Sequence, residues 1–240
     1  MRYAIYFSPA PTQPLSKAAA AWLGRDAFRG ETYPMPDVAG IEPDTLRDLT
    51  ADPRRYGFHA TLKAPFTLAD GRTEAELISA LEAFAAGSAP FSIPNAIVGQ
   101  LGRFFALVPD QVYPQLQAFA SRVVETFEPF RAPLSEADMA RRRPDRLTTS
   151  ERANLDRWGY PYVHDDFRFH MTLTGQVDPE LADAMRLVLE QRFAAFHNAP
   201  LAIDGLALFV EPARGEPFHV HRWLPLALQA DHADHRKTAS

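Results

Sequence analysis

Short apolar runs, several of them alternating with polar residues, predict the β-strands of this chain. Successive side chains of a strand point to opposite faces, so a strand buried on one face has a two-residue spacing. Such runs occupy residues 3–7, 58–68, 91–109, 167–174, 201–210 and 218–226. The third run is broken between Gly99 and Gly102, which predicts a hairpin, and the last two runs predict another.

Apolar residues at helical spacing fall between these runs. The predicted helical stretches cover residues 16–28, 77–85, 116–127 and 181–196. Thr73 and Glu76 have the spacing of a capping box before the second stretch, and Asp178 is a candidate cap for the fourth. Residues 30–53 are rich in Pro, Asp and Gly, which predicts a long surface loop with one helical turn near Leu46.

The segment 131–161 differs from its surroundings because it is polar and rich in arginine. Pro144 divides it, and Thr148 and Glu151 again have capping-box spacing, so we predict two short helices. Its clustered arginines are Arg141, Arg142, Arg143 and Arg146. A solvated helix face explains this cluster, and the alternatives are a lid over a phosphate or part of a nucleic-acid path.

Two segments of the chain share one plan, which indicates an internal duplication. Each contains Phe-His-x-Thr-Leu, then a helical stretch, then an Ala-Pro pair that enters a predicted hairpin. The motifs begin at Phe58 and Phe169 and the pairs at Ala89 and Ala199, so both landmarks recur with nearly the same offset. We therefore predict one bilobal domain. Its parts are repeat one at about 54–130, an insert at 131–161 and repeat two at about 165–228, within residues 1–230 and before a polar tail at 231–240.

The duplicated motif displays one histidine and one threonine on a single face of each predicted strand. His59 and Thr61 are two residues apart, as are His170 and Thr172, so each pair shares a face. The residue between them, Ala60 in the first copy, points the other way into a core. A pseudo-twofold arrangement of the copies would bring two imidazoles and two hydroxyls into one cleft.

These groups suit phosphoryl chemistry that needs no metal and no cofactor. Histidine titrates near neutral pH, so one ring can accept a proton from water while the other donates one to the leaving oxygen. The threonine hydroxyls can hold the nonbridging phosphate oxygens. The motifs do not say which histidine is the acid. A hydrogen-bonded structural histidine and a metal site are the alternatives, and His219 and His221 offer two more candidate ligands on one strand face.

The charge and cysteine content narrow the class of ligand. The formal net charge is −5 and the pI about 5.9, which argues against a general nucleic-acid binder but allows a small phosphorylated substrate in a local basic pocket. The absence of cysteine excludes disulfides and thiolate catalysis. The N-terminal run is too short and polar for a signal peptide, and no apolar run is long enough to span a bilayer. We therefore expect a cytoplasmic protein without membrane contact.

The paired motifs resemble those of the 2H phosphoesterase superfamily, which takes its name from two His-x-Thr/Ser motifs. The flanking strings, Arg54 to Lys63 and Trp158 to Thr174, resemble a narrower branch described as phosphonate metabolism proteins. The resemblance covers about residues 2–228. It implies an α+β, bilobal, duplicated fold in which two antiparallel sheets line a central cleft and helices lie outside.

By this resemblance, His59 and His170 would be the catalytic pair, and Thr61 and Thr172 would bind the phosphate. The branch implies a small cyclic phosphate or a sugar phosphate of phosphonate breakdown as the substrate, and a ring-opening phosphodiesterase fits that context. One alternative is an enzyme that processes RNA ends carrying a 2',3'-cyclic phosphate. A protein that binds a phosphorylated ligand without catalysis is the other.

Several further residues are candidates for the cleft. Lys63 and Arg168 lie two residues from the motifs and would compensate phosphate charge if the strands stay regular, although exposed strand ends explain them equally well. The possible cleft-lining residues are Tyr3, Tyr6, Arg54, Tyr56 and Tyr160. Tyr160, with Trp158 and Tyr162, could stack on a base or sugar or pack the insert onto the main body.

Overall fold

The computed structural model describes residues 1–227, and the predicted polar tail lies outside the described residues. Eight strands form a single sheet in the order β6-β3-β4-β5-β2-β1-β7-β8, and every neighbouring pair is antiparallel. The strands are β1 (Arg2–Phe7), β2 (Ala60–Phe66), β3 (Phe91–Leu101), β4 (Phe104–Pro109), β5 (Met171–Thr172), β6 (Ala199–Ile203), β7 (Gly205–Glu211) and β8 (His219–Pro225).

The α+β class is confirmed, but the prediction of two separate sheets is wrong. Strand β5 pairs with β4 on one side and with β2 on the other, through Ala60 opposite Met171, so the two halves are continuous. Only two residues of the predicted strand at 167–174 form a strand, and these two residues join the two halves of the sheet. Each half also mixes the repeats, because β5 of the second lies beside β4 of the first.

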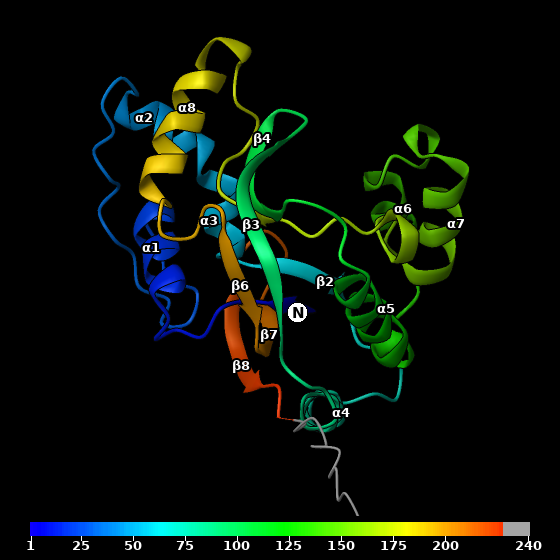
Figure 1. Ribbon diagram of the computed structural model, residues 1–240. Helices are drawn as coiled ribbons and strands as arrows, with labels where there is room; N and C mark the ends of the chain where they lie inside the picture. Colours follow the sequence, from blue (N-terminus) through cyan, green and yellow to red (C-terminus); the bar gives the residue numbers. More distant parts are fainter. Residues whose placement is uncertain (228–240) are drawn as a thin grey trace, which may run out of the picture.

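The sheet is strongly curled because its chain connections require it. Only Asp204 separates β6 from β7, although these strands stand at the first and seventh places of the sheet order. The backbone N–H of Leu226, just after β8, donates to the Asp204 carbonyl, which ties this corner to the opposite edge. Figure 1 shows β6 and β7 close together while β2 crosses between them and the insert. The inner surface of the curl is where the two motifs lie.

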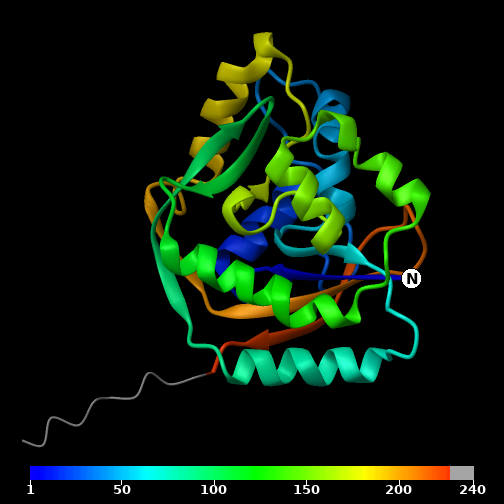
Figure 2. The ribbon, with the colours of Figure 1, turned by 90° about the vertical axis from the view of Figure 1, so that its right-hand side faces the viewer.

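Eight α-helices surround the sheet in the described residues. They are α1 (Pro14–Leu23), α2 (Pro43–Leu49), α3 (Ala51–Tyr56), α4 (Glu74–Ala86), α5 (Pro114–Phe127), α6 (Glu136–Arg141), α7 (Thr149–Trp158) and α8 (Pro179–Arg192). In Figure 1, α1, α2 and α8 gather at one side, and α6 and α7 of the insert stand apart at the other. Figure 2 shows α4 and α5 side by side, and Phe84 contacts Phe119 between them at 5.9 Å.

Alternation along β1 separates two apolar cores. Tyr3, Ile5 and Phe7 face the large core, which takes its other members from α1, α4, α5 and α8. Ala4 and Tyr6 face the inner surface, where a small cluster includes Phe209 and Phe218. The helices therefore cover one face of the sheet, and the inner face is left for the site. None of the described helices has the length and hydropathy of a membrane span.

Local signals in the sequence located most helices well. Both predicted capping boxes form, at Thr73 with Glu76 and at Thr148 with Glu151. The predicted loop at 30–53 contains α2, at the place of the helical turn expected near Leu46, and also the first half of α3. Helix α2 begins with Pro43 at its first position. It has only seven residues, about two turns, so its apolar spacing is too short to predict a helix clearly.

Lys63 lies on the helix-covered face of β2, so the expectation that it shares the cleft face does not hold. Thr61 pairs with Tyr6 of β1, but Lys63 pairs with Ile5, which means that Leu62 is an extra residue in β2. Such a bulge reverses the alternation of the residues that follow it. Lys63 therefore points with Ile5 toward α5, and its side chain is 3% exposed.

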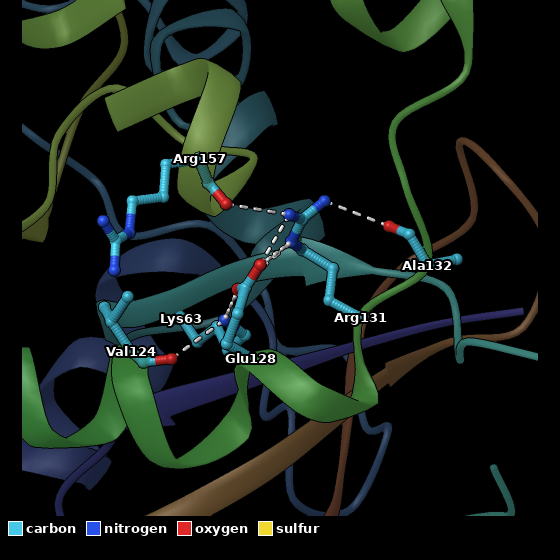
Figure 3. Close-up of polar contacts among 6 residues, drawn as sticks. All are labelled: Lys63, Val124, Glu128, Arg131, Ala132 and Arg157. Carbon is cyan, nitrogen blue, oxygen red and sulfur yellow. Dashed lines mark hydrogen bonds and ion pairs between the residues drawn. The ribbon is translucent and has the colours of Figure 1, made fainter. Parts of the chain in front are cut away.

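The Lys63 ammonium belongs to a network that joins β2, α5 and the insert (Figure 3). Its Nζ donates to Glu128 Oε2 at 2.8 Å and to the Val124 carbonyl at 3.2 Å. Arg131 binds the same carboxylate at 2.6 Å and donates to the Arg157 carbonyl of α7 at 3.3 Å. Burial lowers the pKa of Lys63 and the Glu128 carboxylate opposes this. Glu128 thus compensates two cations at once.

We expect the substitution Glu128→Gln to destabilise the protein, because it removes the anion from a buried ammonium. Breaking such a pair typically costs about 3–5 kcal/mol, whereas Lys63→Met, which removes the buried charge itself, should cost clearly less. Urea unfolding gives both values. The matched control is Glu125→Gln at an exposed position of α5. An equal loss in Glu128→Gln and Glu125→Gln would contradict the network's role.

Candidate functional site

The two His-x-Thr motifs lie side by side on the inner face of the curled sheet. Ala60 of β2 pairs with Met171 of β5 in antiparallel register. Continuing this register by one residue in each direction sets His59 opposite Thr172 and Thr61 opposite His170. Residues directly opposite in an antiparallel pair share a face and have Cα atoms about 4.5–5.5 Å apart. The two motifs therefore lie side by side, and His59 and Thr172 line one cavity.

Both histidines are oriented by the same backbone contact. His59 Nδ1 lies 2.8 Å from the Gly57 carbonyl, and His170 Nδ1 lies 2.7 Å from the Arg168 carbonyl, two residues earlier in each case. A carbonyl only accepts hydrogen bonds, so Nδ1 carries the proton and Nε2 holds the lone pair of the neutral ring. Thr61 Oγ1 lies 3.3 Å from His59 Nε2 and can donate to it.

Gly57 is required for the carbonyl that orients His59. Its φ is +79°, and a Cβ at this position would come 2.5 Å from the Cβ of Ala27. A side chain would therefore be strained by the backbone and blocked by a neighbour. The glycine ends α3 and turns the chain sharply into the motif, so that the imidazole faces the inner surface.

The histidines lie among aromatic rings that keep them neutral. The His59 ring stacks on Tyr6 at 3.9 Å, with Tyr56 at 5.9 Å, and His170 meets the edge of Phe104 at 5.7 Å. Burial lowers the pKa of His59 to about 4. Repulsion from His170 also lowers this pKa, and the hydrogen bond with the Gly57 carbonyl raises it in part. Burial also lowers the pKa of His170. Both rings are therefore neutral bases at pH 7 in the free protein.

A cavity of about 330 Å³ opens beside the histidine pair, which is enough for a small ligand. His59, Thr172 and Tyr56 line it together with Phe104 and Arg55. A second cavity of the same volume adjoins it, since Arg55 and Tyr56 line both. One residue of each motif, His59 of the first and Thr172 of the second, thus faces a cavity that a small molecule could occupy.

Three of the further candidates lie elsewhere or bind other groups. The Tyr3 hydroxyl donates to Glu74 Oε2 at 2.8 Å on the helix-covered face, because Tyr3 alternates with Tyr6 along β1. Arg54 donates to the carbonyls of Leu23 and Arg47, and so ties α3 to α1 and α2. These two are not cleft-lining residues, and neither is Lys63.

The other candidates divide between the cleft and its border. Tyr6 and Tyr56 lie against His59 as expected. Arg168 contributes its carbonyl to His170, but its exposed guanidinium donates to the Asp165 and Phe167 carbonyls and borders a different cavity. The strand is irregular before Met171, so the expected alternation fails there. Tyr160 of the insert packs edge-on to Tyr162 and carries the Arg142 guanidinium over its ring at 5.0 Å.

The site also contains residues that sequence reasoning missed. Phe104, Arg55 and Gln176 line the histidine cavity. Arg2 lines the adjoining cavity. A signal for Arg2 was available, since it lies four residues before Tyr6 on β1, and residues an even number apart on a strand share a face. The other candidate metal ligands do not assemble: His221 Nε2 lies 3.4 Å from Glu74 Oε1, and residues 1–227 contain no group of three or more His, Asp or Glu side chains placed to hold a metal ion.

Fold and motifs define an α+β protein in which two His-x-Thr pairs share one antiparallel sheet. The chain belongs to the family described as "Protein of unknown function (DUF1045)", which matches residues 61–219. It is 40% identical over 236 residues to "Ribose 1,5-bisphosphate phosphokinase PhnN" of Janthinobacterium sp. (strain Marseille), covering 97% of this chain and 52% of that protein. The namesake in Laribacter hongkongensis (strain HLHK9) is 36% identical over 233 residues, covering 95% and 53%. The chain thus spans about half the length of these curated relatives.

Among solved structures, the chain is similar to E. coli LigT complexed with NADP+. The identity is 16% and the TM-score 0.44, with 95% of this chain and 98% of the other covered. It is also similar to TT0787 of Thermus thermophilus, with 16% identity and a TM-score of 0.40 over the same shares.

The low pKa of His59 predicts that the protein loses stability as the pH falls. Its pKa is about 4 in the folded protein and about 6.5 in an unfolded chain, so the unfolded state binds more protons between these values. The free energy of unfolding should be undiminished above about pH 6.5 and should drop by on the order of 2 kcal/mol toward pH 4 from this group.

Urea unfolding of the wild type and of His59→Asn at several pH values measures this effect. As the pH falls from 7 to 4, the unfolding free energy of the wild type should fall more than that of His59→Asn, because asparagine takes up no proton on unfolding. A difference that is constant with pH would show that the His59 pKa is not depressed.

Proposed function

We propose that this protein is a phosphodiesterase that hydrolyses a small cyclic phosphodiester on a sugar. One observation carries the proposal: His59 and His170 immediately precede two adjacent antiparallel strands, β2 and β5, and each is anchored through Nδ1 on a carbonyl. In this proposal both Nε2 atoms serve one cavity, which His59 lines directly and which His170 approaches through its contact with the lining residue Phe104. A structural role for the histidines gives no reason for the same anchoring to occur twice.

In the proposed reaction, water attacks phosphorus while one neutral Nε2 accepts its proton. A new P–O bond forms to this oxygen, and the bond from phosphorus to one oxygen of the cyclic diester breaks. The other imidazole, protonated at Nε2, gives its proton to the departing oxygen. The product carries a phosphomonoester and a free hydroxyl, and Thr61 and Thr172 donate to the nonbridging oxygens.

In this scheme, binding of the anionic substrate causes one of the two histidines to become protonated. Both imidazoles are neutral in the free site because burial lowers their pKa values. An anionic phosphodiester beside a ring favours its charged form and so raises its pKa. Binding therefore recruits one proton to the pair, and the ring nearer the leaving oxygen becomes the acid.

The names of the relatives support a ribose as the carrier of the cyclic phosphate. Both are named for a kinase that acts on ribose 1,5-bisphosphate, a ribose with two phosphate groups. Opening a cyclic phosphate on a phosphorylated ribose yields a sugar of this class. The resemblance of the motif flanks to phosphonate metabolism proteins points to the same kind of substrate.

A kinase activity is the second candidate, because the relatives carry that name. No glycine of this chain is followed by lysine, so the phosphate-binding motif GxxxxGK[ST] is absent from the sequence. We therefore propose that the kinase activity belongs to the half of the relatives that this chain does not match. The two activities would then be consecutive steps on one sugar.

Replacing either histidine should abolish most turnover of a ribose cyclic phosphate. We expect His59→Ala and His170→Ala each to lower kcat by roughly 10²–10⁴-fold, since each removes an acid or a base. His219→Ala on β8 is the control and should leave kcat unchanged, and EDTA should have no effect. Full activity in both variants would contradict the mechanism. A wild type that binds the cyclic phosphate without turning it over would favour the non-catalytic alternative.

A direct assay separates the two candidate activities. With ATP and ribose 1,5-bisphosphate, we expect this chain to release no ADP above background, because it has no P-loop. The same preparation should open the cyclic phosphate. ADP formation that depends on ribose 1,5-bisphosphate would instead assign the kinase to this chain.

A further inference from the structure

The cavity that adjoins the histidine site is lined by arginines from four distant parts of the chain. Its volume is about 330 Å³. The arginines are Arg2 of β1, Arg55 of α3, Arg141 and Arg142 of the insert, and Arg214 of the β7–β8 connection. Because Arg55 and Tyr56 border both cavities, a ligand of modest size can occupy the two together.

The carboxylates in this cavity are too few to neutralise the arginines. Only Asp138 and Glu211 line it as acids against five guanidiniums. Asp52, which lines the neighbouring cavity, lies 3.8 Å from Arg55, so an excess of at least two positive charges remains. This excess occurs in a protein whose overall charge is −5, so it is local. A concave site with such an excess attracts small anions.

Each carboxylate holds two arginines in place. The fully buried Glu211 binds Arg2 and lies 3.5 Å from Arg55. Asp138 binds Arg141 at 2.8 Å and Arg214 at 2.7 Å. Burial tends to raise the pKa of Asp138, but the hydrogen bonds from Arg141, Ser135 and Arg214 lower it to about 2, so it stays ionised. A guanidinium has five N–H donors, and these pairs use only some of them.

Arg142 has no carboxylate within salt-bridge distance in the described part of the chain. Its guanidinium instead lies over the Tyr160 ring at 5.0 Å, which orients it without neutralising it. The Asp138–Arg214 pair holds α6 of the insert against the β7–β8 connection, so that Arg141 and Arg142 reach the cavity. The insert therefore forms part of the wall of this cavity, where the sequence favoured a solvated helix face.

We propose that this arginine cavity binds a second phosphate group of the substrate, a phosphomonoester on the same sugar whose cyclic phosphodiester lies at the histidine pair. The proposal rests on the proposed function and specifies its substrate class. Arginine forks match phosphate oxygens in bidentate geometry, and a phosphomonoester carries up to two negative charges. The arginines converge on one small cavity beside the site and do not form an extended basic track, which favours a compact sugar bisphosphate over a nucleic acid.

The test compares two substrates and two variants. The substrates are a ribose 1,2-cyclic phosphate with a 5-phosphate and the same compound without it. We expect the wild type to prefer the first in kcat/KM, and Arg142→Gln to reduce this preference by roughly 10- to 100-fold, as for the loss of a charged hydrogen bond. Arg146→Gln, an exposed arginine of the same insert outside the cavity, should keep the preference.

A binding measurement separates this proposal from the proposed function. Calorimetric titration with ribose 5-phosphate, which has no cyclic diester, should give a Kd at least about tenfold weaker for Arg142→Gln than for the wild type or Arg146→Gln. If this holds while no cyclic phosphate is hydrolysed, the proposed function fails and the arginine site stands.

Three results would overturn the arginine site. One is a ribose 5-phosphate affinity that is undetectable in the wild type or equal in Arg142→Gln. Another is equal kcat/KM of the wild type for the two cyclic compounds. The third is a higher kcat/KM for an oligonucleotide ending in a 2',3'-cyclic phosphate, since the cavity would then serve an RNA backbone.

Discussion

The site depends on the antiparallel pairing of β2 with β5, because that pairing alone brings the two repeats into register at the cleft. It spans little more than Ala60 and Met171, and both are almost completely buried. With this pair fixed, the two motifs lie side by side, and each imidazole is oriented by the carbonyl two residues before it in the segment that leads into the strand. Partial burial among aromatic rings then lowers the pKa values of both imidazoles and keeps them neutral. Geometry and protonation state thus both follow from one short strand contact.

The sequence predicted the parts of the site that depend on local pattern. Alternation placed His59 with Thr61 and His170 with Thr172, and the repeat indicated that the pairs meet. The same rule failed at Lys63 because a bulge in β2 is set by pairing with β1, which is distant in the chain. It failed again at Arg168, where the chain reaches β5 without regular strand structure. The local periodicity of the sequence cannot reveal a bulge that depends on pairing with a strand distant in the chain.

The arginine cavity could not have been assembled from the sequence for a related reason. Its members come from β1, α3, the insert and the β7–β8 connection, and no spacing rule links these segments. Glu211 and Asp138 connect them in space, since each carboxylate joins arginines far apart in the chain or on different elements. The cluster at 141–146 was visible as composition, but only the fold distinguishes Arg142, inside the cavity, from Arg146, outside it.

The single-residue link at Asp204 bears on how this chain folds. Strand β6 completes the half of the sheet that contains β3 and β4, whereas β7, one residue later, pairs with β1 at the far side. The half with β1 and β7 forms only when residues near both ends of the chain meet, and the other half requires β3 to meet β6 about 100 residues later, so both halves depend on contacts that span long stretches of sequence. Chains with such high contact order fold slowly, because loop closure precedes the contacts that compensate it. Cooperative and comparatively slow folding is therefore built into the topology that creates the cleft.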